Sequence, residues 1–201
     1  PWNAIGLFRL LNLRSFIVLF RGILLAFILI TIVLASLSWG PWVQSFGGVN
    51  LEQFLNAIFL GTFVGIAEEL IFRGWLLGEM VQLLGSRNGV IVQSMIFSLA
   101  HIRFKLPFNE LILLLLGLFL LGLILALRRS LDEGSLWGAI GLHGGLVGGW
   151  FLINSGTIDI AENVPIWLVG PGASDPNPIG SLGAMISMAL IIFYQRKDFA
   201  K

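Results

Sequence analysis

The 201-residue sequence contains no cysteine, and this absence excludes several kinds of chemistry. Disulfide bonds, thiolate metal sites, cysteine nucleophiles and S-acylation all require a thiol. Charge is scarce as well, because only 11% of the residues are Asp, Glu, Lys or Arg. The net charge is +1 and the basic residues are dispersed, so no basic patch indicates a nucleic-acid partner or a polybasic lipid anchor.

What the sequence has in abundance is apolar residues. They make up 57% of the chain, and the mean hydropathy of +0.93 lies far outside the range of soluble globular proteins. This composition predicts an all-α, multi-pass integral membrane protein with a single membrane domain and membrane lipids as its surroundings. We expect about six spans, preceded by an N-terminal interfacial helix over residues 3–13. The apolar stretches cover residues 16–37, 51–84, 90–100, 111–127, 136–153 and 182–194.

Residues 51–84 are too long for one straight crossing, since 34 helical residues extend about 50 Å. We expect Gly61 and Gly65 to kink this helix. The distribution of Lys and Arg predicts that both termini lie on the cytoplasmic side. Arg103 and Lys105 conflict with that topology, so either the crossing before them is incomplete or they have another task.

Residues 136–153 contain six glycines at spacings of three and four residues. Small residues at this spacing let helices approach closely, which predicts that the segment lies at the centre of the bundle. A phosphate-binding glycine loop is the weaker interpretation, because no strand precedes these glycines.

Glu68, Glu69 and Arg73 place three charges inside an apolar segment. Ionisable groups within a membrane are candidates for function. Glu69 and Arg73 are separated by four residues and share one helix face, so we expect them to form an ion pair. Glu68 lies about 100° around the helix and is the less compensated carboxylate, which makes it the candidate general base.

His101 and His143 are the only histidines in the chain, and both adjoin or lie within apolar helices. Each by itself is more typical of a buried polar residue than of a catalyst. Together with Glu68 they form a set that can activate water or, as a less favoured alternative, bind a divalent metal such as zinc. The spacing of the three residues does not separate these two chemistries.

The motifs resemble those of the CAAX-protease and bacteriocin-processing family, also called the abortive-infection family, of intramembrane glutamic endopeptidases. The resemblance covers residues 51–155, between an N-terminal part at 1–50 and a C-terminal part at 156–201. It rests on Glu-Glu-x-x-x-Arg at residues 68–73, on Phe-x-x-x-His from Phe97 to His101, and on His143.

The resemblance implies that Glu68 and His101 activate the attacking water, that His143 helps to stabilise the oxyanion, and that Glu69, Arg73 and Phe97 support them. It implies no cofactor. The expected substrate is a peptide or a membrane-protein segment.

Val147 departs from the family pattern, which has Asn or Asp four residues after the last histidine. Loss of one oxyanion donor typically lowers the rate by about 10²–10³. The alternative to an active protease is therefore a weak or inactive member that serves as a membrane scaffold or as an assembly subunit of a larger membrane-protein complex. Asn154 is too far along the helix to substitute, at about 16 Å.

Overall fold

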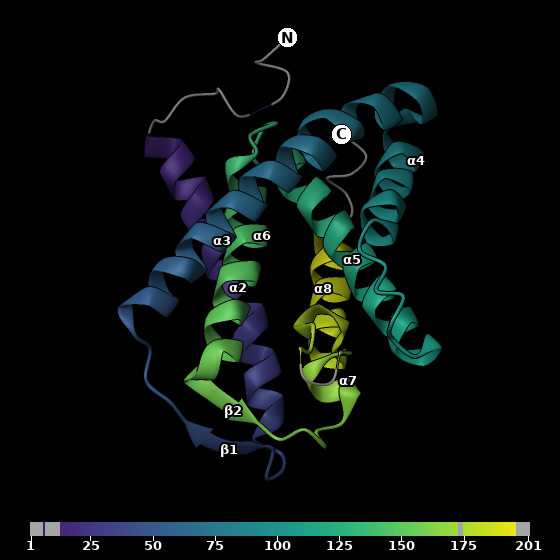
Figure 1. Cartoon of the computed structure of the whole chain (residues 1–201). Coiled ribbons are helices and arrows are strands. Elements are labelled where there is room, and N and C mark those ends of the chain that lie inside the picture. The colour runs from purple at the N-terminus through teal and green to yellow at the C-terminus, as the bar shows by residue number, and fades with distance from the viewer. Residues whose placement is uncertain (1–5, 7–12, 173–174, 196–201) are drawn as a thin grey trace.

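The architecture is an all-α bundle with a small two-stranded sheet at one end, as the composition predicts (Figure 1). The computed structural model describes residue 6 and residues 13–172 and 175–195. The interfacial helix expected over residues 3–13 therefore falls almost entirely outside the described residues. In chain order the main helical elements are α2 (Leu13–Leu37), α3 (Leu51–Glu69), η1 (Leu70–Leu76), α4 (Leu77–Leu99), α5 (Phe108–Leu131), α6 (Trp137–Leu152) and α8 (Leu182–Gln195).

Three helical stretches in the described part of the chain are long and apolar enough to cross a membrane: Leu13–Leu37, Leu51–Leu99 and Phe108–Leu131. The middle stretch does not run straight, because Gly85 adopts φ 78° and ψ 165° and breaks α4. A Cβ atom built on Gly89 would lie 2.6 Å from the backbone of Val81, so the chain folds back on itself at this break. Residues 86–99 then extend only about 21 Å, less than the ~30 Å of hydrocarbon, and end close to His101.

The kink expected at Gly61 and Gly65 is wrong, since α3 continues through both residues. Both glycines serve helix packing instead. The Cβ positions of Gly61 and Gly144 would each lie 2.5 Å from the carbonyl oxygen of the other residue, which leaves no space for a side chain between α3 and α6. A glycine that bends a helix and one that accommodates a neighbour look alike in sequence, and here the close approach explains the residue.

Helix α6 lies at the centre of the bundle, as its glycine pattern predicts. One part of its surface contacts α3, and another contacts α2, where the Cβ position of Gly141 would lie 2.2 Å from the carbonyl oxygen of Leu19. Leu142, His143 and Leu146 of α6 are buried. The two neighbours therefore hold α6 in one orientation, which directs His143 into the bundle.

Loops close the end of the bundle that carries the two-stranded sheet. Strands β1 (Val43–Phe46) and β2 (Ile158–Ile160) pair antiparallel there, and the short helices α7 (Ile166–Val169) and η3 (Pro178–Gly180) follow. Arg103 lies at the same end, where its Nη1 atom donates to the backbone oxygen of Asp175 at 3.1 Å and lies 3.4 Å from the carboxylate. Arg103 thus contacts this loop, which agrees with the expectation that it has another task.

Candidate active site

The buried centre of the site is the ion pair between Glu69 at the end of α3 and Arg73 in η1. Arg73 Nη1 lies 2.8 Å from Glu69 Oε1, and neither side chain is exposed. Arg73 Nη2 also donates to the carbonyl oxygen of Gly122 on α5 at 3.4 Å, and the Arg73 Cζ atom lies 4.1 Å from the centroid of the Phe97 ring. The predicted pairing is confirmed, and the guanidinium has partners on three sides.

Glu68 meets both histidines. Its Oε2 atom lies 3.2 Å from His101 Nε2 and 3.8 Å from His143 Nε2, so three residues from separate segments converge. The side chains of Glu68 and His101 are 28% and 29% exposed, whereas that of His143 is 6% exposed. The side chains of Glu68 and His101 are therefore partly open to solvent, although the Glu68 Oε2 atom itself is buried, and His143 forms the buried side of the site.

The orientation of His101 follows from its position just after α4. Its Nδ1 atom lies 2.7 Å from the carbonyl oxygen of Phe97, which can only accept a hydrogen bond, so Nδ1 carries a proton. In the neutral ring Nε2 is then free of a proton and faces the carboxylate of Glu68. Two acceptor atoms at this distance can share one proton or one water molecule, and this arrangement suits proton transfer.

His143 makes a contact that the sequence motifs did not predict. Its Nδ1 atom lies 2.8 Å from Glu69 Oε1, the same oxygen that pairs with Arg73. Hydrogen bonding of a histidine to a carboxylate fixes the ring orientation and favours a proton on the bonded nitrogen. Glu69 therefore connects Arg73 to His143, and its task extends beyond neutralising the arginine.

Phe97 packs against both histidines. It is fully buried, and its ring centroid lies 4.7 Å from that of His101 and 5.7 Å from that of His143. Phe72 of η1 meets Phe97 edge-on at 5.0 Å. The aromatic residue of the second motif thus forms an apolar wall behind the polar groups and keeps them in place.

Gln93 is a buried polar residue that belongs to none of the sequence motifs. It lies on α4 one turn before Phe97, is fully buried, and neither atom of its amide group has a hydrogen-bond partner among the described residues. The only sequence signal is a glutamine inside the apolar run of residues 90–100. Glu69 Oε2 and Arg73 Nε also lack partners within the described part of the chain.

Val147 lies one turn after His143 on α6 and is half-buried. A valine side chain has no hydrogen-bond donor. Asn154 does not replace it, because its Nδ2 atom donates to Asp175 Oδ1 at 3.2 Å in the loops at the end of the bundle. The departure from the motif therefore has no evident substitute at Asn154.

The less favoured metal interpretation involves the same three residues, Glu68, His101 and His143. Within residues 13–172 and 175–195, no group of three or more His, Asp or Glu side chains is arranged to hold a metal ion.

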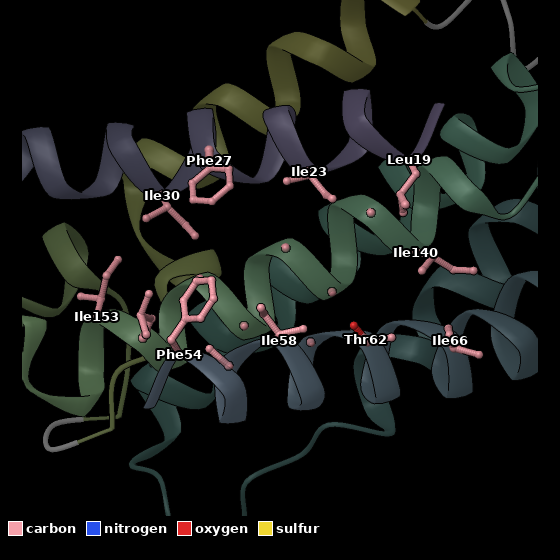
Figure 2. Close-up of a pocket in the computed structure, with 18 of the residues that line it drawn as sticks. Leu19, Ile23, Phe27, Ile30, Phe54, Ile58, Thr62, Ile66, Ile140 and Ile153 are labelled. Carbon is pink, nitrogen blue, oxygen red and sulfur yellow. The ribbon is translucent and has the colours of Figure 1, made fainter. Parts of the chain in front are cut away.

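A separate cavity of about 490 Å³ opens between α2 and α3, with the glycines of α6 as its floor (Figure 2). Ile23 and Phe27 of α2 face Ile58 and Thr62 of α3 across it. None of Glu68, Glu69, Arg73, His101 or His143 lines this cavity. The polar site therefore occupies a different face of α6 from the apolar cavity.

The fold and the site together define a multi-pass helical membrane protein with a buried Glu–Arg–His cluster. A family model described as "Type II CAAX prenyl endopeptidase Rce1-like" matches residues 50–148. This match supports the family of CAAX-type intramembrane proteases that the motifs indicate. The matched region runs from the residue before α3 into α6 and contains every motif residue from Glu68 to Val147. Comparison with curated proteins gives no match, and comparison with solved structures gives none either.

Proposed function

We propose that this protein is a glutamic-type endopeptidase that hydrolyses peptide bonds of membrane-associated substrates without a metal ion. The observation that carries the proposal is the convergence of Glu68, His101 and His143 from three separate segments, with the first two partly exposed. The family match also supports the proposal, because the matched residues 50–148 contain all three side chains and the family model describes an endopeptidase.

In the proposed reaction, Glu68 and His101 hold a water molecule and Glu68 takes a proton from it. The hydroxide oxygen bonds to the carbonyl carbon of the substrate, and the carbonyl oxygen becomes an oxyanion. His143, with Nδ1 held by Glu69, donates from Nε2 to this oxyanion when its ring is protonated. The carbon–nitrogen bond then breaks, and the proton held by Glu68 passes to the leaving amine.

Val147 supports a second candidate function. The absence of an oxyanion donor at this position is what a weak or inactive family member would show, and such a protein would act as a membrane scaffold or as an assembly subunit. The proposed protease has its other motif residues intact, so we place the scaffold second. A stable partner on gently solubilised protein, with no proteolysis, would support the scaffold.

The test compares the N-termini of proteins in membranes that contain the native chain, Glu68→Gln or Val147→Asn. Termini produced by the native chain should disappear in Glu68→Gln, because the amide cannot act as a general base, and should increase with Val147→Asn by up to about 10²–10³-fold in initial rate. Glu79→Gln, a change at an exposed acid on α4, is the matched control and should behave as the native chain.

A chelator and added zinc complete the design. We expect neither to change the rate. Loss of cleavage with chelator and recovery with zinc would instead assign the Glu68, His101 and His143 set to metal binding. Identical termini in all variants, at equal protein abundance, would reject the protease and favour the scaffold.

A further inference from the structure

We propose that Arg129 is a positioning residue of the candidate active site, which holds the η1 turn and thereby the ring of His143. The ring position can be tested whether or not the chain is a protease, and only the rate effect rests on the proposed function. Sequence patterns explain Arg129 simply as a basic residue at the end of a span. The structure gives it a specific partner.

The first observation is the widened turn of η1. The backbone N–H of Leu77 donates to the carbonyl oxygen of Phe72, five residues earlier. In an α-helix the same N–H would donate to the carbonyl of Arg73, four residues earlier. The π-helical turn therefore leaves the Arg73 carbonyl without its ordinary donor, inside a residue that is fully buried. An unsatisfied carbonyl in that position is costly, so a replacement donor stabilises the turn.

The second observation identifies the donor. Nη1 of Arg129 on α5 donates to the Arg73 carbonyl oxygen. A hydrogen bond from a charged guanidinium is stronger than one between neutral groups. The Gly122 carbonyl, seven residues earlier on the same face of α5, accepts from Arg73 Nη2 at 3.4 Å. Helix α5 thus contacts both the backbone and the side chain of Arg73.

The position of Arg73 is transmitted to His143 through a single oxygen atom. Arg73 Nη1 and His143 Nδ1 each lie 2.8 Å from Glu69 Oε1. If η1 relaxed to α-helical geometry, the Arg73 side chain would rotate about the helix axis relative to Glu69, because the number of residues per turn changes. The two side chains would still share one helix face, but the direction from which Arg73 meets Glu69 Oε1 would change, and the orientation of the His143 ring on the same oxygen would change with it.

Arg128 is a matched control on the adjacent position of the same helix. Its Nη2 atom donates to both carboxylate oxygens of Asp132, at 2.9 Å and 3.0 Å. Arg128 has the same charge and lies at the same end of α5. A variant at Arg128 therefore removes a basic side chain from the same region and leaves the Arg73 carbonyl untouched.

The experiment uses the full chain in lipid bilayers with ¹⁵N-labelled histidine. Because the chain has only two histidines, the spectra contain the ring signals of His101 and His143 alone, and His101→Asn assigns them. We expect Arg129→Met to shift the His143 ring signals and leave those of His101 in place, because His101 pairs with Glu68 and not with Glu69. Arg129→Lys keeps a charged donor and should restore the native His143 signals.

Unchanged His143 signals in Arg129→Met, or an equal shift in Arg128→Met, would overturn the proposal. Equal shifts of both histidines in Arg129→Met would also overturn it, since general loosening of the bundle moves both rings. If Arg129→Met does not fold, Arg129→Gln carries the same test, because its shorter neutral side chain should lose the contact and shift His143 alone. In the cleavage assay, Arg129→Met should slow the appearance of new termini at least about tenfold. If native protein produces none, the protease proposal fails while the shift of His143 remains decisive for Arg129.

Discussion

Replacing Arg73 with methionine removes the only guanidinium that pairs with Glu69 among the described residues and keeps a flexible side chain in its place. Both members of the pair are fully buried, so the carboxylate cannot be solvated when its partner is lost. The variant also removes the cation that lies over the Phe97 ring and the donor to the Gly122 carbonyl. The substitution therefore removes only contacts that lie together inside the bundle, those of Arg73 with Glu69, Phe97 and Gly122.

The magnitude follows from these contacts. Loss of one member of a buried ion pair costs about 3–5 kcal/mol, and a desolvated cation–π contact contributes about 2 kcal/mol. Glu69 retains its hydrogen bond with His143, so we expect a loss near the lower end of that range, about 3 kcal/mol in the free energy of unfolding. The double variant Glu69→Gln with Arg73→Met leaves no uncompensated charge from the pair, and it should be less destabilised than the sum of the two single variants by about 1–3 kcal/mol.

The assay is reversible unfolding of purified protein in mixed micelles, with the free energy extrapolated to zero denaturant. Arg87→Met, at an exposed arginine near the Gly85 break, is the matched control and should lie within about 0.5 kcal/mol of the native chain. A loss below 1 kcal/mol for Arg73→Met, or strict additivity in the double variant, would refute the argument that the buried pair stabilises the site.

Two further substitutions test the packing and the loops. Gly144→Ala should lower the free energy of unfolding by about 1–3 kcal/mol, because its Cβ would lie 2.5 Å from the Gly61 carbonyl oxygen. Gly78→Ala, where no atom lies within 4 Å of the added Cβ, should instead raise the free energy of unfolding by about 0.5–1 kcal/mol. A loss of stability in both variants would count against the packing argument. Arg103→Ala should cost less than about 1 kcal/mol by the same unfolding measurement, because Arg103 and Asp175 are largely exposed; a larger cost would show that the loop contact supports the bundle.

The helical membrane class and the Glu69–Arg73 pair were predictable because each depends on local pattern. Apolar runs of known length reveal helices that can cross a membrane, and a spacing of four residues places two side chains on one helix face. The set of Glu68, His101 and His143 was expected from the scarcity of such residues in apolar helices and from the family resemblance, but spacing along the chain did not show how the three would meet. Their side chains are brought together by the fold-back at Gly85 and by the orientation of α6, neither of which spacing along the chain determines.

The sequence by itself determined the apolar class, the central glycine helix and the motif residues, because composition and periodicity carry that information. Only the tertiary structure decided that Gly61 lets α3 approach α6 closely and that Gly85 breaks α4. It also decided that Glu69 contacts His143 and that Arg129 donates to the carbonyl of Arg73. The physical reason is that a glycine, a carboxylate and a basic residue each have several uses, and the neighbour that the fold supplies selects among them.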